Sequence, residues 1–197
     1  MAMSGLAKYF VNREARGLKN FQALRKYLST LPMEEIHAAL EIGCGIGTVS
    51  ASLVQNYPLS AWGTDYDPGQ IDAARHFYPE TERLHFQVED AASFSFGDST
   101  FALVITQNVL HHVPQWEKAI GEIARVMRPG GYCLYDDFVI PAGLKALVRR
   151  MGRDRTPYTF DEILGTCSRN HLTIQRQERS MRFIFPRFLL VLAKITS

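Results

Sequence analysis

The sequence predicts an α/β fold with a doubly wound, mostly parallel sheet of seven strands, and two observations carry this prediction. Strand-like and helix-like patterns alternate from residue 37 onward, an order typical of parallel strands covered by helices on both faces. Two apolar stretches, 172–177 and 188–193, then follow each other without a helix long enough for a crossover. They therefore predict an antiparallel C-terminal hairpin at the edge of the sheet.

Each element is predicted from its own pattern. Residues 3–30 place apolar side chains at three- and four-residue intervals, as one helical face requires, until Pro32 interrupts the pattern. The strands expected before the hairpin are 37–42, 59–64, 84–88, 101–106 and 132–136. The helices expected between and after them are 46–55, 68–77, 115–127, 143–150 and 160–168. Right-handed connections between parallel strands fix most of the topology.

Length and composition are those of one globular domain. The chain has 197 residues, of which 46% are apolar and 21% charged. We expect a single domain over 1–197, with a helical leader at 1–35 and a cofactor-binding core at 36–197. No apolar run approaches the ~20 residues of a membrane span and no signal-peptide core is found at the start, which predicts a cytoplasmic protein. The three scattered cysteines form neither a disulfide framework nor a metal-ligand set.

Charge is distributed unevenly along the chain. Residues 1–143 hold 11 Lys and Arg against 16 Asp and Glu, whereas residues 144–197 hold 11 against 4. This asymmetry suggests an anionic partner, although a solvated basic face would give the same count. The residues that would receive an anionic group are Arg149, Arg150, Arg153 and Arg155. No nucleic-acid-binding motif accompanies them.

The segment from Glu41 to Gly47 has the pattern of a buried strand end, a turn of alternate glycines and the start of a helix. Glycine has no Cβ and lets a ligand lie against the main chain, and the first N–H groups of a helix have no internal partner. A nucleotide-like ligand is therefore predicted here. The dinucleotide fingerprint G-x-G-x-x-G does not fit, because it requires glycine where Ile46, Thr48 or Ser50 stand.

The pattern present, E-x-G-x-G-x-G, resembles the first motif of the class I S-adenosylmethionine-dependent methyltransferases. The segments GTDYDP at 63–68, VEDA at 88–91 and RVMRPGG at 125–131 resemble later parts of that family, in order and at suitable intervals. The chain is most similar to its small-molecule members, of the type found in ubiquinone and menaquinone biosynthesis. The resemblance implies a Rossmann-like fold, S-adenosyl-L-methionine as cofactor, S-adenosyl-L-homocysteine as product and methyl transfer as the activity.

The resemblance also implies which residues hold the cofactor. Asp65 would accept hydrogen bonds from both ribose hydroxyls, with Tyr66 packed on the adenine, whereas Asp67 would cap the helix that begins at Pro68. Asp90 and the amide of Ala91 would meet the adenine edge. The predicted cofactor-binding residues are Glu41, Gly43, Gly45, Gly47, Asp65, Tyr66, Asp90, Ala91 and Gln107.

Two of these assignments leave an alternative open. Glu89 replaces Asp90 if the register of the third strand is off by one. Gln107 would line the cofactor partly through its backbone. The chain also departs from the family at Ala102, because the family usually has an acidic residue at this position. Any role that the family's carboxylate plays there is therefore absent from this chain.

His111 and His112 follow the fourth strand and are the candidate catalytic residues, because they titrate near neutrality close to the predicted reaction centre. Either could take a proton from a hydroxyl or phenol, or could simply be satisfied by local hydrogen bonds at a helix start. Two other functions stay open. One is a methyltransferase-like subunit or regulator that binds the cofactor without catalysis. The other is a nicotinamide-dependent oxidoreductase, which the glycine spacing and the terminal hairpin oppose.

The acceptor is predicted to be a small molecule. Only the short segment 138–159 separates the fifth strand from the last helix, which leaves no room for a large substrate domain. We expect the acceptor to bind under the leader and the region 144–158, where the arginines would suit an anionic group. The expected oligomeric state is a monomer or a homodimer, and no metal is expected.

Overall fold

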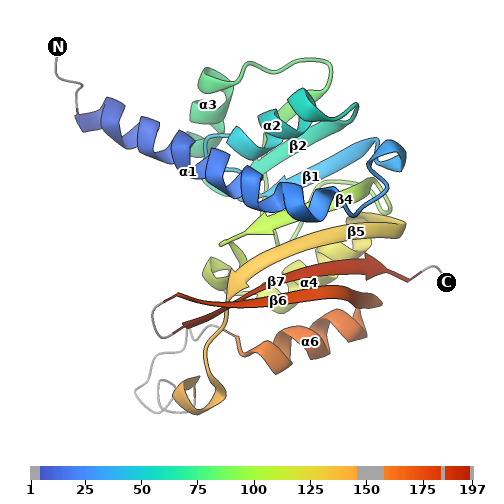
Figure 1. Ribbon diagram of the computed structural model, residues 1–197. Helices are drawn as coiled ribbons and strands as arrows, with labels where there is room; N and C mark the ends of the chain where they lie inside the picture. Colours follow the sequence, from blue (N-terminus) through green and yellow to red (C-terminus); the bar gives the residue numbers. More distant parts are fainter. Residues whose placement is uncertain (1–4, 146–157, 183–184, 196–197) are drawn as a thin grey trace. The chain divides into compact units, whose positions relative to one another are not determined.

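The computed structural model describes residues 5–145, 158–182 and 185–195, with the backbone alone for 5–13 and 182 (Figure 1). The helices are α1 (Gly5–Leu28), α2 (Thr48–Asn56), α3 (Pro68–Phe77), α4 (Trp116–Val126) and α6 (Phe160–Arg169), with the 3₁₀ turns η1 (Met33–Glu35) and η2 (Leu110–His112). The strands are β1 (Ala38–Ile42), β2 (Ser60–Asp65), β3 (Leu84–Val88), β4 (Phe101–Gln107), β5 (Met127–Phe138), β6 (Leu172–Arg182) and β7 (Phe185–Lys194).

The sheet confirms the predicted fold class. Its seven strands have the order β3-β2-β1-β4-β5-β7-β6. The pairs β1/β2, β2/β3 and β4/β5 are parallel, whereas β7 pairs antiparallel with both β5 and β6. The chain forms two compact units, Met1–Glu89 and Asp90–Ser197, which are described separately below. The single domain over 1–197 stays a prediction.

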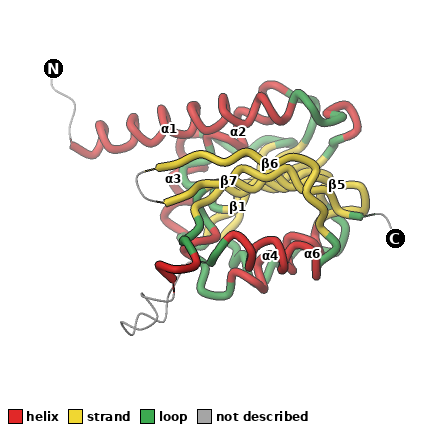
Figure 2. The backbone as a smooth tube through the Cα atoms, turned by 60° about the horizontal axis from the view of Figure 1, so that its bottom comes forward, coloured by secondary structure: helices red, strands yellow, loops and turns green. Residues whose placement is uncertain are grey.

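In the first unit, the predicted leader is a helix that packs against α2 (Figure 2). Its buried face has the predicted three- and four-residue spacing and consists of Phe21, Leu24, Tyr27 and Leu28. The two helices approach so closely that a Cβ on Gly17 would lie 2.5 Å from the Cβ of Thr48. The hydroxyl of Tyr78, at the end of α3, donates a hydrogen bond to Glu14 at 3.0 Å. The leader is thus held by both neighbouring helices.

In the second unit, α4 and α6 lie on the same face of the strands (Figure 2). The buried face of α4 consists of Ala119, Ile120, Ile123, Ala124 and Val126. Helix α6 begins with a capping box between Thr159 and Glu162, each satisfying a backbone N–H of the other. Its first residue, Phe160, stacks on Phe188 of β7 with ring centroids 3.8 Å apart. This contact fixes the start of α6 against the sheet.

Several element boundaries differ from the prediction, and two of these differences concern glycine-rich segments. Helix α2 begins at Thr48 instead of residue 46, because Gly47 has a φ of 81° and cannot be helical. Helix α4 ends at Val126, and β5 begins at Met127 instead of residue 132. The Arg-Pro-Gly-Gly segment 128–131 forms an irregularity opposite the start of β4, since the register shifts between Phe101 and Leu103. The segment therefore lies inside the strand instead of separating helix and strand.

Some predictions fall outside the described residues. Of the predicted helix 143–150, residues 143–145 are helical, in a segment that begins at 142, and the remainder lies outside. The same holds for Arg149, Arg150, Arg153 and Arg155. Among the helices that the structure describes, none is both long and apolar enough to cross a membrane.

Candidate functional site

The glycine turn at the carboxyl end of β1 uses backbone angles that favour glycine. Gly43, Gly45 and Gly47 have φ values of 70°, 56° and 81°. The Cys44 N–H donates to the carbonyl of Thr64 at 2.8 Å, and the Gly47 N–H donates to the carbonyl of Cys44 at 2.9 Å. These bonds close the turn and tie it to the end of β2. The main chain of the turn is therefore fixed, and three of its residues carry no side chain.

Glu41 supports the turn from β1. One of its carboxylate oxygens accepts hydrogen bonds from the backbone N–H of Ser50 at 2.8 Å and from the Ser50 hydroxyl at 2.5 Å. Burial raises the pKa of Glu41 to about 7, although both bonds from Ser50 oppose this shift. The carboxylate thus holds the first turn of α2 against β1. Direct contact between Glu41 and the cofactor stays a prediction.

Glu41→Gln is expected to change how stability depends on pH. The pKa of Glu41 rises from 4.5 to about 7 on folding, so its stabilising contribution is full below pH 4.5 and is lost as pH rises through 7. The loss amounts to at most roughly 3 kcal/mol. Urea unfolding between pH 5 and 8 should show a fall in the free energy of unfolding for the wild type that Glu41→Gln removes. An identical slope in both proteins would mean that another group titrates.

Asp65 lies at the end of β2 beside the glycine turn. One carboxylate oxygen accepts the N–H of Gly45 at 3.0 Å, and the other accepts the N–H of Asp67 at 3.0 Å. A carboxylate oxygen can accept two hydrogen bonds, so each keeps capacity for a ligand hydroxyl. Asp65 is half-buried, and the turn and the carboxylate together fit the sugar and the amino-acid end of a nucleoside ligand. The contact itself stays a prediction.

The two residues after Asp65 have different surroundings. Tyr66 is 76% exposed, which leaves its ring available for a ligand, but its packing on adenine stays a prediction. Asp67 caps α3 as predicted, because its side chain accepts the N–H of Gly69 at 2.9 Å and Pro68 occupies the first turn. Asp67 is therefore assigned to the helix and Asp65 to the site.

The remaining predicted cofactor residues belong to the second unit. The side chain of Asp90 accepts the N–H of Ala92 at 2.8 Å, and Ala91 is buried. The amide nitrogen of Gln107 donates to Asp136 at 3.4 Å, while its buried amide oxygen has no hydrogen-bond partner among the described residues. An unpaired buried acceptor is costly, so this oxygen is suited to a ligand donor. The roles of Asp90, Ala91 and Gln107 toward the cofactor stay predictions.

The two candidate histidines differ in their partners. The Nδ1 atom of His111 lies 2.5 Å from a carboxylate oxygen of Asp137, and the His111 backbone N–H donates to the other oxygen at 3.2 Å. The ring of His112 contacts that of His111 at a tilt of 45°, with centroids 3.8 Å apart, and its side chain is exposed. Partial burial and the neighbouring His111 lower the pKa of His112. The structure therefore pairs His111, and not His112, with a carboxylate.

Asp137 is held from several sides. It is 1% exposed and also accepts the Phe138 N–H at 2.7 Å and the Tyr158 hydroxyl at 3.0 Å. Burial, with Tyr135 and Asp137 close by, raises the pKa of Tyr158, so its phenol stays protonated and donates. Because a carboxylate only accepts, Nδ1 of His111 carries a proton, and in the neutral ring Nε2 then has the lone pair. This is the arrangement of a histidine general base oriented by an acid.

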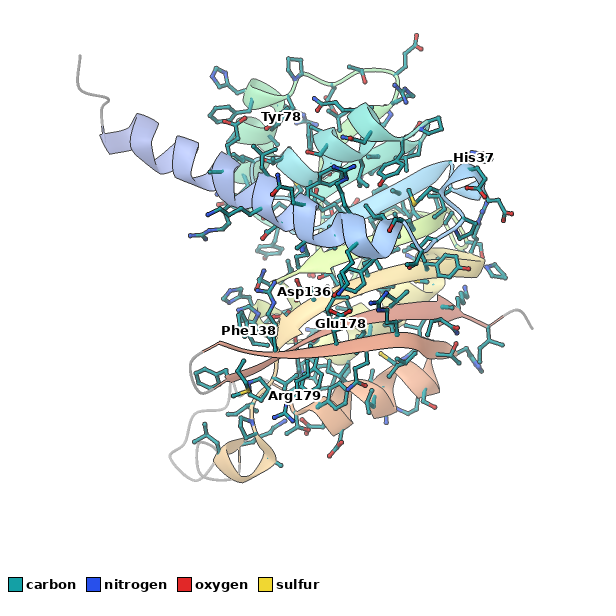
Figure 3. All side chains as sticks on the ribbon, in the orientation of Figure 1. His37, Tyr78, Asp136, Phe138, Glu178 and Arg179 are labelled. Carbon is teal, nitrogen blue, oxygen red and sulfur yellow. The ribbon has the colours of Figure 1, made fainter. Side chains whose placement is uncertain are left out.

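A second acid, Asp136, lies on the opposite face of β5 from Asp137, since neighbouring residues of a strand alternate. Arg187 of β7 donates to both carboxylate oxygens of Asp136 at 2.5 Å, from Nε and Nη2. The guanidinium also lies 5.4 Å from the centroid of the Phe138 ring. Figure 3 labels Asp136 and Phe138 near the carboxyl end of β5.

Sequence reasoning missed Asp137, Tyr158, Asp136 and Arg187. The signal that could have found the first was the pair of acids at the end of a predicted strand, because carboxyl ends of parallel strands meet at one edge. Tyr158 and Arg187 gave no local signal. Within the part of the chain that the structure describes, no group of three or more His, Cys, Asp or Glu side chains could hold a metal ion.

The sequence is similar to known methyltransferases. Residues 40–135 match a family model described as a methyltransferase domain. The chain is 32% identical over 111 residues to a 2-methyl-6-phytyl-1,4-hydroquinone methyltransferase of Synechocystis sp., covering 56% of this chain and 34% of that protein. It is 31% identical over 121 residues to a fatty-acid O-methyltransferase of Mycolicibacterium smegmatis, covering 60% and 44%.

The family model and the curated relatives make the chain similar to S-adenosylmethionine-dependent methyltransferases. This similarity implies S-adenosylmethionine as the cofactor. The solved structure of a SAM-dependent methyltransferase from Methanosarcina mazei has a TM-score of 0.69 at 22% identity, covering 81% of this chain and 93% of that one, which shows the shared fold. The chain spans only 34% and 44% of the length of the two curated relatives.

Proposed function

We propose that the protein transfers the methyl group of S-adenosylmethionine to a hydroxyl oxygen of a small molecule, with His111 as the general base. The observation that carries this proposal is the contact of 2.5 Å between Nδ1 of His111 and the buried Asp137. The contact leaves Nε2 able to take a proton. The glycine turn and Asp65 are the residues that would hold the cofactor in the first unit.

The bound cofactor would supply a methyl group that its positive sulfur has already activated. An amine needs no base to accept that group, whereas an alcohol must lose its proton during the transfer. A histidine oriented by a buried acid is therefore a feature that an alcohol acceptor would need, whereas an acidic phenol would not. The name of one relative, a fatty-acid O-methyltransferase, supports an oxygen acceptor.

The alternative is a protein that binds the cofactor or its product without catalysis. Ala102, which stands where the family usually has an acid, favours this alternative. Turnover with a panel of phenols, alcohols and amines, followed by mass spectrometry of the products, distinguishes the two. A methylated oxygen in the product supports the proposal, and cofactor affinity without any product supports the alternative. Location in the cytoplasm, the small-molecule class of the acceptor and the oligomeric state stay predictions.

Asp65→Ala is expected to weaken cofactor binding by about 10- to 100-fold, because hydrogen bonds to a charged group contribute roughly 1.5–3 kcal/mol. The measurement is the Kd of S-adenosylhomocysteine by calorimetry, with a nicotinamide dinucleotide as the rival ligand. Asp67→Ala is the matched control: it removes the neighbouring carboxylate and a helix cap, and should leave the Kd unchanged. Equal affinity in Asp65→Ala and wild type would overturn the assignment of the sugar site.

A further inference from the structure

We propose that Arg187 and Phe138 form a subsite for a carboxylate carried by the methyl acceptor. The inference rests on the proposed function, because it requires that the acceptor reaches His111. The proposed acceptor carries a hydroxyl to be methylated and a carboxylate, with about the width of one aromatic ring between the two groups.

Phe138 connects the two groups that such an acceptor would need. The His111 ring meets the Phe138 ring edge-on, with centroids 5.8 Å apart. The guanidinium of Arg187 lies 5.4 Å from the same centroid. Phe138 and Arg187 are also register partners in the antiparallel pairing of β5 and β7. The base and the cation therefore each lie within 5.8 Å of the centroid of one aromatic ring at the end of β5.

Arg187 keeps donors that its ion pair does not use. Its Nε and one N–H of Nη2 are bound to Asp136, while its two Nη1 donors have no hydrogen-bond partner among the described residues. The side chain is 22% exposed. The Nη1 and remaining Nη2 donors form a planar fork that matches a carboxylate. Because Asp136 fixes the guanidinium, little side-chain freedom is lost when a ligand binds.

A purely structural role for Arg187 is the competing explanation. Asp136 is 4% exposed and needs a partner, because an unpaired buried charge is strongly destabilising. The two explanations predict different changes in ligand affinity when Asp136 is removed. If Arg187 only neutralises Asp136, removing that acid has no effect on ligand affinity or weakens it through disorder. If Arg187 receives a carboxylate, removing the competing acid strengthens binding of that carboxylate.

The shape of the site selects among carboxylates. The Phe138 ring adds an apolar surface close to both the base and the cation, and stacking or edge contacts with a second ring contribute roughly 0.5–1.5 kcal/mol. A planar aromatic hydroxy acid fits this description better than a long flexible acid. We therefore choose 4-hydroxybenzoate as the probe and 4-hydroxybenzamide, which has the same shape without the charge, as its matched control.

The test measures binding of both probes by calorimetry in the presence of saturating S-adenosylhomocysteine. In the wild type we expect 4-hydroxybenzoate to bind about tenfold more tightly than the amide. Asp136→Asn should raise that ratio severalfold. Arg187→Gln should reduce the ratio to about one, and Arg187→Lys should give an intermediate value, because it keeps the charge without the fork. Arg179→Gln removes an equal charge from the neighbouring strand β6 and should leave the ratio unchanged.

Three results would overturn the subsite. These are equal affinity of the wild type for both probes, absence of binding by either at millimolar concentration, and weaker benzoate binding in a folded Asp136→Asn variant. The proposed function is judged separately by turnover. Methylation of hydroxyl acceptors without any preference for the acid leaves the function and removes the subsite. Tighter binding of the acid that depends on Arg187, without methyl transfer to any acceptor, leaves the subsite and removes the proposed function.

Discussion

His111→Ala is expected to lower kcat for an alcohol acceptor by about 10²- to 10⁴-fold, the usual contribution of a positioned general base. If His111 is the general base, Nε2 would receive the proton from the acceptor, because Nδ1 is bound to Asp137. Removing the ring removes that base. The Kd of S-adenosylhomocysteine should stay the same, because the loss concerns proton transfer and not the cofactor turn. The measurement is steady-state turnover alongside calorimetry.

His112→Ala is the matched control for this experiment. It removes a neighbouring imidazole that is exposed and has no carboxylate as hydrogen-bond partner among the described residues. We expect kcat to change less than threefold. Added imidazole should restore part of the activity of His111→Ala, since the space left by the ring can admit a free base. Equal losses in both histidine variants, or no loss in either, would contradict the assignment of His111.

Gly47→Ala is expected to destabilise the protein by roughly 2–5 kcal/mol, for two reasons that add. A residue with a Cβ is strained at a φ of 81°. The new Cβ would also lie 2.5 Å from Cζ and 2.6 Å from Cε1 of Phe86, which is buried. The ring has little room to move, because Cδ1 and Cε1 of Phe86 already lie 2.8 Å from the corresponding Cβ position of Gly63. Urea unfolding measures the effect.

Gly165→Ala provides the matched control, the same substitution inside α6. Its Cβ would meet only the end of the flexible Arg169 side chain at 3.4 Å, and alanine favours a helix. We expect this variant to be as stable as the wild type or more stable by up to about 1 kcal/mol. Combining Gly47→Ala with Phe86→Leu should recover part of the loss by relieving the contact. If Gly47→Ala alone unfolds at the wild-type midpoint, the packing of Phe86 does not require glycine.

Much of the fold could be predicted because local pattern and final structure agree. Alternation of strand and helix signals located β1 to β5, and the missing crossover located the β6/β7 hairpin. The errors arose where local signals conflict. Glycine permits both a helical turn and positive φ, so the start of α2 could not be read from Gly47 alone. Gly130 and Gly131 suggested a break but form an irregularity inside β5.

The site could be predicted only as far as its residues are close in sequence. The glycine turn and Asp65 follow directly from the order of strand, turn and strand. The base could not be chosen between His111 and His112, because the choice depends on Asp137, which is 26 residues away. Arg187 lies 51 residues from Asp136 and reaches it only through the antiparallel register of β7. Such contacts depend on tertiary structure, and no local pattern encodes them.

The close approach of Gly17 to Thr48 has a consequence for how the leader responds to ligands. Thr48 is the first residue of α2, directly after the glycine turn, so α1 touches the element that the turn positions. Suppose that a nucleoside binds the turn more tightly when α1 is docked. The same coupling free energy must then make α1 dock more tightly when the nucleoside is bound. Amide protons around Gly17 should then exchange more slowly when S-adenosylhomocysteine is present, which makes the leader an internal reporter of occupancy.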